Sequence, residues 1–293
     1  MKGLVIINGY PNGEKFIRQG ERIAEELRLL GIPTDVVKNG EVCAVINEDG
    51  SIKTTLTKEY DFAVYLDKDK YLGRMLEACG LCLFNRAEAV EICDDKMQTY
   101  LALRNAGISV VKSIPAPLCY TPNAQPNQQF LQIIEDELGF PLVAKKSYGS
   151  FGAGVQLVHG SLELQKTEET WLHTPHFYQA FIKESAGRDI RVLVIGGKAV
   201  AAMERVAQKG EFRSNVELGG KGRAVKLEAS YACVAESAAK VLGLDYCGVD
   251  LLEGENGAIV CEVNSNAFFE GLELATGVNV AREYAKHILA SFS

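Results

Sequence analysis

Residues 248–264 constrain the fold of this chain more than any other stretch. They read as an apolar strand, a turn rich in Gly and Asn, and a second apolar strand, which is the pattern of a β-hairpin. Three side chains with oxygen donors interrupt the apolar pattern: Asp250, Glu262 and Asn264. Oxygen donors of this kind suit Mg²⁺, which usually keeps coordination positions open for water and substrate phosphate. The hairpin therefore predicts a metal site built on a sheet.

The alternation of side chains along a strand decides whether these donors can meet. Glu262 and Asn264 are two residues apart, so they share a face. Asp250 joins them only if it pairs directly across the hairpin, which requires an odd number of loop residues, such as 255–257. A two-residue turn at 256–257 would place Asp250 on the wrong face. The alternative is an ordinary hairpin with solvated carboxylates, although carboxylates among apolar neighbours are costly to bury without a metal or a cation.

Composition and charge narrow the class of protein. The 293 residues are 47% hydrophobic, enough for one large or two small domains. The net charge of −7 argues against a general surface for nucleic acid or anionic membranes. No apolar run approaches the roughly 18 residues of a membrane span, and the apolar start of the chain leads at once into polar residues. We expect a cytoplasmic protein without a signal peptide, and its oligomeric state, including a homo-oligomer, stays open.

The cysteines and histidines offer no clear catalytic pattern. Eight cysteines are scattered through mostly apolar segments, which suits buried reduced thiols better than disulfides. Cys79 and Cys82 have redox or zinc spacing but lack a second Cys or His pair. His173 and His176 flank Pro175, which breaks the helix that would align their rings.

Periodicity predicts a change of architecture near residue 93. Before it, short strands alternate with helices, as in a small open α/β domain (strands 4–8, 34–37, 61–66 and 82–84; helices 16–30 and 71–79). After it come a helix capped by Asp94 or Asp95 and a proline-rich connection. Further segments follow (strands 141–145, 155–158, 177–182, 190–195 and 199–204; helices 130–138, 231–242 and 280–292).

The segment 146–155 is a glycine-rich loop. Its glycines at 149, 152 and 154 free the backbone amides to face phosphate oxygens. The spacing matches neither the Walker nor the dinucleotide pattern. Because residues 155–158 alternate as a strand, the loop joins two strands, which favours a flap over a nucleotide; a purely structural glycine hairpin is the alternative. Lys145 before the loop and Lys96 in the first turn of its helix are candidates to neutralise phosphate charge.

Two arginines and a long loop are further candidates. Arg191 and Arg205 lie on predicted strands, where they either face a site or are solvated charges. The polar stretch 208–223 is basic and glycine-rich and carries Arg213 and Asn215. Such a loop can close over an anionic intermediate, or it is a plain surface loop.

The order of these features resembles the ATP-grasp superfamily, and more closely its RimK-type carboxylate–amine (alpha-L-glutamate) ligases. Seven segments between about residues 94 and 292 carry the resemblance: 95–96, 141–145 with the glycine loop, 187–191, 201–205, 212–215 with Gly219 and Gly220, 248–250 and 262–264. The resemblance implies an α/β (α+β) fold with an N-terminal domain, 1–92, and an ATP-grasp domain, 93–293. The second domain would divide into a lid subdomain at about 108–180 and a metal-binding subdomain at 181–293.

The resemblance also implies roles for single residues. ATP would lie between two antiparallel sheets, and Asp250, Glu262 and Asn264 would hold one or two Mg²⁺ ions, or Mn²⁺ in their place. The residues implied to contact ATP are Lys96, Lys145, Ser150, Phe151 and Gly152 near the phosphates, Gln179, Ala180, Phe181 and Ile182 at the adenine, Asp189 at the ribose, and Arg213 at the phosphates. Arg191, Arg205 and Asn215 would hold the acyl phosphate or the substrate carboxylate.

The implied reaction is amide formation through an acyl phosphate. A substrate carboxylate attacks the γ-phosphate of ATP, and an amine, with glutamate the expected amino acid, then displaces phosphate. The acceptor would be a peptide, a protein C-terminus or a cofactor. Two positions depart from the family pattern: Ala180 stands where members often have Glu, and residues 265–271 replace a common Ala-Ser-Pro-Gly continuation.

Three other functions are alternatives to this one. An ATP-grasp ligase for another pair, such as D-alanine, is disfavoured because Gly248 stands where an Arg is expected. A non-catalytic ATP-binding regulatory protein would not need a full set of metal ligands. A dinucleotide-dependent oxidoreductase would carry a glycine fingerprint at the first strand–helix turn, which residues 9–13 lack.

Overall fold

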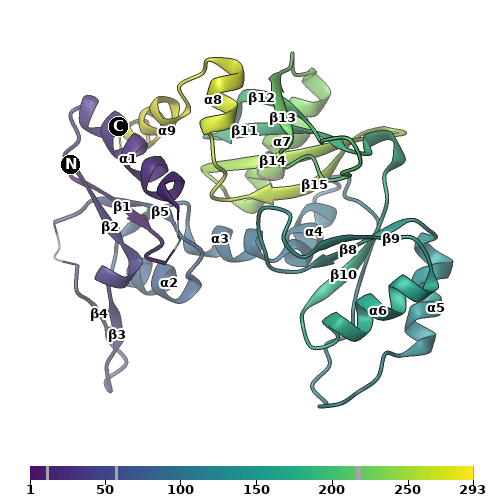
Figure 1. The fold of residues 1–293 in the computed structure, drawn as a ribbon. Coiled ribbons are helices and arrows are strands. Elements are labelled where there is room, and N and C mark those ends of the chain that lie inside the picture. Colours follow the sequence, from purple (N-terminus) through teal and green to yellow (C-terminus); the bar gives the residue numbers. More distant parts are fainter. Residues whose placement is uncertain (11–12, 57–58, 216–218, 293) are drawn as a thin grey trace.

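The computed structural model describes residues 1–10, 13–56, 59–215 and 219–292. Figure 1 shows three groups of elements: an N-terminal one with the purple strands, a teal one with α5 and α6, and a green and yellow one with β11 to β15. Each group contains a sheet, and each sheet has its own strand order.

The N-terminal sheet is parallel, with the order β2-β1-β5-β6 (β1 Gly3–Ile7, β2 Thr34–Lys38, β5 Phe62–Leu66, β6 Cys82–Phe84). All residues of β1 are buried, as expected for a parallel strand covered on both faces. Helices α1 (Glu14–Leu29) and α2 (Lys70–Ala78) cover it, and these predictions are confirmed. A small hairpin of β3 (Ala44–Ile46) and β4 (Ile52–Thr54), preceded by the short helix Asn39–Glu41, was not predicted.

Two helices connect this sheet to the rest of the chain: α3 (Ala87–Asp94) and α4 (Lys96–Asn105). The side chain of Asp95 accepts hydrogen bonds from the amides of Met97 and Gln98 and so caps α4. Helix α3 was not predicted, because its N-cap residue, Arg86, makes no capping hydrogen bond and leaves no start signal.

The second sheet is antiparallel, with the order β7-β10-β8-β9 (β7 Ser113–Pro115, β10 His176–Ala180, β8 Leu142–Lys146, β9 Val155–Val158). Helices α5 (Gln128–Leu138) and α6 (Ser161–Trp171) flank it, and together they enclose a separate small core. We call this unit the lid lobe. The expected strands are present, whereas β7 and α6 were not predicted.

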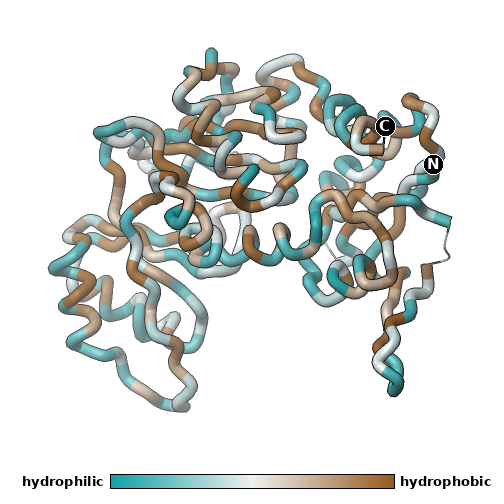
Figure 2. Tube along the Cα trace, turned by 180° about the vertical axis from the view of Figure 1, so that it is seen from behind, coloured by the Kyte–Doolittle hydropathy of each residue, from teal (hydrophilic) through white to brown (hydrophobic). Residues whose placement is uncertain are grey.

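The third sheet is also antiparallel, with the order β13-β12-β11-β14-β15 (β11 Arg188–Ile195, β12 Lys198–Val206, β13 Lys221–Ala224, β14 Tyr246–Gly254, β15 Gly257–Asn264). The short helix Lys183–Ser185 precedes it, and α7 (Ala229–Leu242), α8 (Glu270–Thr276) and α9 (Val280–Ala290) complete the lobe. Figure 2 shows hydrophobic residues along the strands of the sheets and hydrophilic ones at many peripheral turns.

The hairpin register corrects one prediction. Asp250 pairs directly with Glu262, as expected. The loop, however, has two residues, because Gly254 already pairs with Gly257. The ladder shifts between Asp250 and Leu251, which pairs with Val260, so Cys261 is the extra residue of a β-bulge. The bulge supplies the one-residue shift that an odd loop was expected to give.

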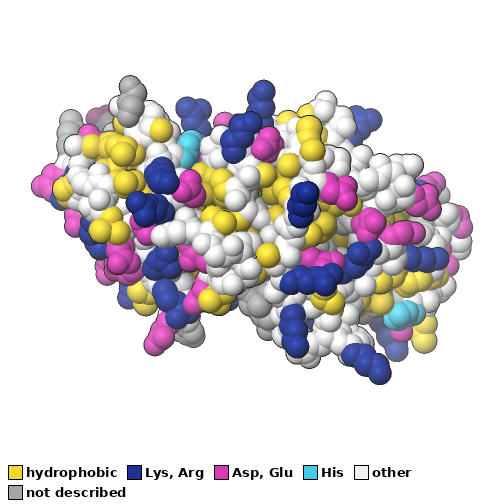
Figure 3. Space-filling model, turned by 90° about the horizontal axis from the view of Figure 1, so that it is seen from above, with side chains coloured by type: hydrophobic (Ala, Val, Ile, Leu, Met, Phe, Trp, Pro, Cys, Tyr) yellow, Lys and Arg dark blue, Asp and Glu magenta, His cyan; other side chains and the backbone are white. Residues whose placement is uncertain are grey.

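Charges and cysteines complete the description. Figure 3 shows basic and acidic side chains intermixed on the face seen from above. Within the described residues, no helix is long and apolar enough to span a bilayer. All eight cysteines are free, as expected, but Cys43, Cys79, Cys82 and Cys233 are exposed, so the expectation of buried thiols is wrong for these four.

Candidate functional site

Two adjoining cavities occupy the spaces between the sheets. We call the one between the lid lobe and the third sheet the lid cavity; its volume is about 110 Å³. The domain cavity, of about 430 Å³, extends from there to the N-terminal sheet. Both are lined by Lys96, Gly149, Ser150, Asn215 and Glu262, so a group at this junction can reach a molecule in either cavity.

The predicted site residues come together around these two cavities. The lid cavity is lined by Lys96, Lys145, Ser150, Gly152, Gln179, Ala180, Phe181, Ile182, Asp189, Arg205, Arg213, Asn215, Asp250 and Glu262. The domain cavity adds Phe151, Arg191 and Asn264. Residues from segments that are far apart in the sequence thus converge on the two cavities.

Two buried lysines, Lys96 and Lys145, line the lid cavity. Lys96 Nζ lies 3.4 Å from Glu262 Oε1 and donates to the carbonyl oxygen of Gly149 at 2.9 Å. Lys145 Nζ lies 3.5 Å from Cys261 Sγ, and it forms no ion pair with a carboxylate of the described residues. Burial acts to lower the pKa of Lys145, but Cys261, Tyr100 and Glu262 outweigh it and raise this pKa, so the ammonium stays charged. A buried cation without a carboxylate partner favours an anionic ligand.

The glycine loop joins β8 to β9, as predicted, and bends over both cavities. Phe151 (φ 60°) and Gly154 (φ 72°) lie in the left-handed region. A Cβ on Gly154 would approach the Lys146 side chain to 2.8 Å, so this turn requires glycine. Arg213 donates to the carbonyl oxygen of Gly152 at 3.0 Å, which ties the loop around 208–215 to the glycine loop.

A chain of buried charges crosses the third sheet. Arg191 faces Asp250 in the β11–β14 ladder and binds it through two hydrogen bonds of 2.7 Å. Arg205 binds Asp189, its partner in the β11–β12 ladder, at 2.7 and 2.5 Å, and lies 2.8 Å from Asp250. Ser214 Oγ also donates to Asp189 at 2.6 Å. Direct ladder pairing thus places Arg191 beside Asp250 and Arg205 beside Asp189, and Arg205 also bridges to Asp250.

The electrostatics of this chain follow from its burial. Burial acts to raise the pKa of the Asp250 carboxyl, but Arg191 and Arg205 outweigh it and lower this pKa. Burial acts to lower the pKa of Arg205, yet Asp250 and Asp189 raise it. Asp250 and Arg205 are therefore ionised at neutral pH, and each compensates the charge of the other.

Of the oxygen donors predicted for the metal, Glu262 lines both cavities, Asp250 lines the lid cavity and Asn264 lines the domain cavity. Glu262 and Asn264 share a face of β15, and Asp250 lies directly opposite Glu262. Asn264 Nδ2 is buried without a hydrogen-bond partner, so the amide is not held by internal bonds. Two carboxylates and one amide oxygen are a donor set that fits a hard divalent cation. Asp250 already accepts hydrogen bonds from two arginines, but a carboxylate has about four acceptor positions.

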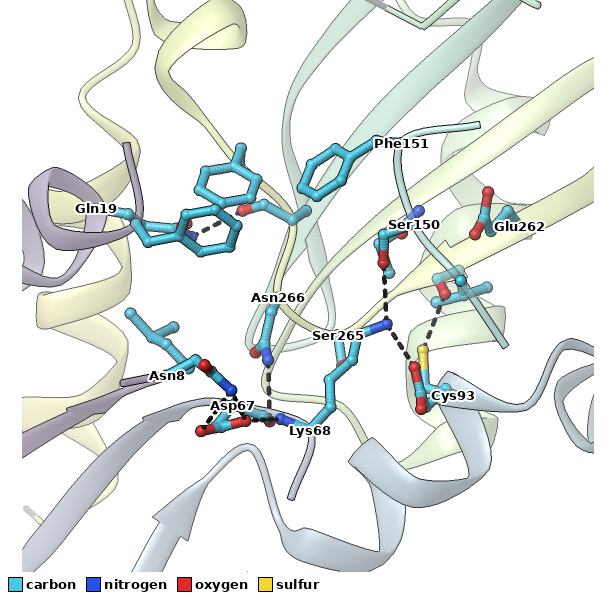
Figure 4. A pocket seen from close by; sticks show the side chains of 18 of the residues that line it. Asn8, Gln19, Asp67, Lys68, Cys93, Ser150, Phe151, Glu262, Ser265 and Asn266 are labelled. Carbon is cyan, nitrogen blue, oxygen red and sulfur yellow. Dashed lines mark hydrogen bonds and ion pairs between the residues drawn. The ribbon is translucent and has the colours of Figure 1, made fainter. Parts of the chain in front are cut away.

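Residues of the N-terminal sheet line the domain cavity and were missed by the sequence analysis. Asn8 follows β1, and Asp67 and Lys68 follow β5; in Figure 4 Asn8 and Asp67 lie beside Asn266, whose Nδ2 donates to the backbone oxygen of Asp67 at 3.1 Å. Ligands of open parallel sheets bind at the carboxyl ends of strands, so the position of these residues directly after predicted strands was a usable signal.

Comparison with known proteins identifies the family. Residues 93–288 match the model of the RimK-like ATP-grasp domain. The chain belongs to the RimK-like ATP-grasp family. A "Probable alpha-L-glutamate ligase" of Vibrio parahaemolyticus serotype O3:K6 (strain RIMD 2210633) is 38% identical over 210 residues, covering 71% of this chain and 67% of the relative. A protein of the same name from Psychromonas ingrahamii (strain DSM 17664 / CCUG 51855 / 37) is 38% identical over 212 residues, or 72% and 68% of the two chains.

Solved structures agree on the fold. The ATP-grasp ligase PsnB, complexed with a phosphomimetic variant of its minimal precursor, Mg and ADP, has a TM-score of 0.71 at 19% identity and covers 100% of this chain and 99% of that one. The D-alanine–D-alanine ligase from Bacillus anthracis complexed with ATP has a TM-score of 0.72 at 20% identity, with 100% of both chains covered. The predicted ATP-grasp fold and the enzyme class, an ATP-dependent carboxylate–amine ligase, are confirmed.

Proposed function

We propose that this RimK-like ligase joins the amino group of an amino acid, glutamate, to a carboxylate of a peptide, a protein C-terminus or a cofactor. The single observation that carries the proposal is the junction of the two cavities. There the cation Lys96 and the oxygen donor Glu262 line both the lid cavity and the domain cavity. A phosphoryl group leaving a nucleotide in the lid cavity can therefore meet a carboxylate in the domain cavity.

In this proposal ATP occupies the lid cavity. Lys96, Lys145 and Arg213 bind its phosphates beneath the glycine loop, Ser150 to Gly152. The segment from Gln179 to Ile182 contacts the adenine through its backbone, because the Gln179 side chain already donates to Tyr100 Oη at 2.8 Å and to Ser113 Oγ at 3.0 Å. Asp189, whose carboxylate forms an ion pair with Arg205, contacts the ribose.

The residues present also fit a divalent cation. Asp250, Glu262 and Asn264 would hold Mg²⁺, with Mn²⁺ as a substitute, and the bound ion supplies positive charge to the triphosphate. In the domain structure we propose, residues 93–293 form the catalytic unit, with about 108–180 as its lid and 181–293 as its metal-binding part. Residues 1–92 then close the domain cavity.

The chemistry needs alignment and charge neutralisation more than a protein nucleophile. A carboxylate oxygen of the acceptor attacks the γ-phosphorus, and ADP leaves with the bridging oxygen. The amine lone pair then attacks the acyl carbon and phosphate leaves, so that the amide forms and the amine loses a proton. Arg191 and Asn215 line the domain cavity and hold the acyl phosphate. Arg205 is 2% exposed and is a positioning residue that fixes Asp250 and Asp189.

The products test the reaction route. Incubation with Mg-ATP, glutamate and a pool of peptides and carboxylates should release ADP and phosphate, measured by chromatography and a phosphate assay. AMP and pyrophosphate would overturn the acyl-phosphate route.

The substitution Glu262→Gln tests the metal site. It removes a negative charge from the predicted metal ligands, so turnover should fall by about 100-fold or more while the fold stays intact. Turnover is measured by phosphate release and folding by circular dichroism. The matched control is Glu255→Gln in the loop of the same hairpin, which should leave turnover unchanged. Equal turnover in both variants would eliminate the metal assignment.

A further inference from the structure

We infer that the carboxylate substrate in the domain cavity carries a separate cationic group, an ammonium or guanidinium, which Asp67 and Asn266 bind. This inference rests on the proposed function, because it describes the substrate of the same site. Amide formation itself does not require such a cationic group on the acceptor.

The position of Asp67 in the sheet is the first argument. In the order β2-β1-β5-β6 the chain passes from β1 to β2 on one side and continues at β5 on the other. The carboxyl ends of β1 and β5 therefore form the crevice where an open parallel sheet binds ligands. Asn8 follows β1 and Asp67 follows β5, and both line the domain cavity.

The partners of Asp67 are the second argument. Its residue surface is 4% exposed, yet all its hydrogen-bond donors are neutral. Oδ1 accepts from the backbone amides of Lys68 at 2.6 Å and Asp69 at 3.3 Å, and the Asn8 amide donates to both oxygens at 3.1 and 3.3 Å. The neighbouring Lys68 ammonium turns away and pairs with Asp94.

No cation of the described residues pairs with Asp67, although a buried carboxylate is costly without one. Oδ2 has only the 3.3 Å bond from Asn8. A cationic group of a ligand in the cavity would supply the missing charge and a stronger donor to this oxygen.

Asn266 supplies a second acceptor at the same place. Its Nδ2 donates to the backbone oxygen of Asp67 at 3.1 Å, which fixes the orientation of the amide. Its Oδ1 is buried and has no hydrogen-bond partner. A donor-only group such as an ammonium satisfies this oxygen together with the Asp67 carboxylate, whereas a carboxylate or carbonyl cannot.

The opposite end of the cavity is lined by cations, each next to a carboxylate of the protein. Arg191 and Lys96 line it near Glu262, where the reacting carboxylate has to lie. Figure 4 shows Asp67, Asn8 and Asn266 grouped away from Glu262 and Ser150. The domain cavity therefore offers cationic donors at one end and acceptors without a cationic partner at the other, and this arrangement complements a molecule with a carboxylate at one end and a non-reacting cation at the other.

Hydroxylamine separates recognition of the acceptor from that of the amine. It attacks the acyl carbon of an acyl phosphate and releases phosphate, so that a hydroxamate reports which carboxylate was activated. The full-length protein is incubated with Mg-ATP, hydroxylamine and matched probes in free and N-acetylated form. The probes are β-alanine, γ-aminobutyrate, L-glutamate, L-lysine and glycyl-L-glutamate.

The wild-type protein should form hydroxamate at least about tenfold faster with the free amine than with the N-acetylated form of the same probe, since acetylation removes the charge. In Asp67→Asn, which keeps an oxygen for the backbone amides, this ratio should collapse toward one. The control is Asp61→Asn: Asp61 precedes β5 at its other end, is exposed, and accepts from the Lys2 amide at 2.6 Å. The ratio in this variant should match the wild type.

The outcomes separate the cation site from the ligase activity. Equal rates with free and acetylated probes in the wild type would overturn the cation site while leaving the ligase proposal intact. A folded Asp67→Asn that keeps the wild-type ratio would overturn the cation site as well. No hydroxamate with any probe, under conditions where Mg-ATP binds, would overturn the proposed function and the cation site together. The wild-type comparison stands even if the variant does not fold.

Discussion

At the scale of single residues, Arg205 is a buried charge held by two carboxylates. Its side chain is 3% exposed and bridges the carboxylates of Asp189 and Asp250. A planar guanidinium suits this role because it can donate to two carboxylates from one fixed plane, which an ammonium cannot. The residue thus links the predicted ribose contact to the predicted metal ligand.

We predict that Arg205→Met lowers the free energy of unfolding by roughly 3–5 kcal/mol, because it leaves two buried carboxylates without their shared partner. Urea unfolding followed by circular dichroism measures the change. The control is Arg223→Met: this arginine lies on the neighbouring β13, and its side chain is 75% exposed. Its loss should change stability by less than about 1 kcal/mol. Similar small changes in both variants would contradict the role of Arg205 as a buried bridge.

At the scale of elements, the two loops over the lid cavity act together. Arg213 is held by Glu211 through hydrogen bonds of 3.0 and 2.8 Å and reaches the glycine loop at Gly152. The hydrogen bond from Arg213 holds the pKa of Glu211 at about 2, so this pair stays ionised at neutral pH. The guanidinium is therefore oriented toward the cavity before a nucleotide arrives.

We expect Arg213→Ala to raise the KM for ATP by about tenfold, because the variant loses both the phosphate contact and the link between the loops. Steady-state phosphate release over a range of ATP concentrations measures it. Lys209→Ala, an exposed position in the same loop, is the control and should leave this KM unchanged. An unaltered KM in Arg213→Ala would show that the loop does not close over ATP.

The lid lobe contains a buried pair that makes its stability depend on pH. Glu168 on α6 accepts from Tyr178 at 2.6 Å and lies 2.9 Å from His176 Nε2, both on β10. The other ring nitrogen of His176, Nδ1, lies 2.7 Å from the Thr174 carbonyl oxygen. Burial acts to raise the pKa of Glu168, but His176 and Tyr178 hold it below its ordinary 4.5.

A carboxyl group with a lowered pKa stabilises the fold above its ordinary pKa, and this contribution is lost as the pH falls through the lowered value. The wild-type protein should therefore lose more unfolding free energy than Glu168→Gln between about pH 6 and about pH 3. Urea titrations at several pH values measure the slope. Glu169→Gln, exposed on the same helix, should keep the wild-type slope. A slope in Glu168→Gln as steep as in the wild type would contradict the role of this carboxyl.

The sequence predicted a helix or a strand well only where that element carries a local signal, such as alternating side chains or a capping residue. The hairpin at 248–264 and the strands around the glycine loop alternate clearly, and both were found. Helix α6 was missed because Gly160 gives no side-chain cap and the helix is only weakly amphipathic. The bulge at Cys261 could not be predicted, because register depends on the partner strand as well as on the loop. Asp67 and Asn266 lie 199 residues apart and meet only through the tertiary fold.

At the scale of the whole molecule, the N-terminal sheet and the third sheet share one core. That core combines Val5 and Phe62 with Leu193, Tyr246 and Tyr284, whereas the lid lobe has a core of its own. Figure 1 shows that α9, at the C-terminal end of the chain, lies beside α1. Any opening that admits substrates should therefore move the lid lobe, while the domain cavity keeps its two walls together.

Asn85 joins these two sheets. It is 1% exposed; its Nδ2 donates to the carbonyl oxygens of Tyr246 and Ser265 at 2.8 and 2.9 Å, and its Oδ1 accepts from the amides of Asp245 and Tyr246 at 2.7 and 3.0 Å. All four backbone groups belong to the lobe that contains the third sheet, whereas Asn85 directly follows β6 of the N-terminal sheet. One side chain therefore forms hydrogen bonds with all four groups and links the two sheets.

We predict that Asn85→Ala lowers the free energy of unfolding by at least about 3 kcal/mol, because it leaves these buried backbone groups without partners. It should also weaken binding in the domain cavity, whose wall continues from Ser265, more than binding of ATP in the lid cavity. Urea unfolding and the KM values for both substrates test this. The exposed Asn105→Ala should stay within about 0.5 kcal/mol of the wild type. A loss confined to ATP binding would mean that the two walls of the domain cavity are held together by other contacts.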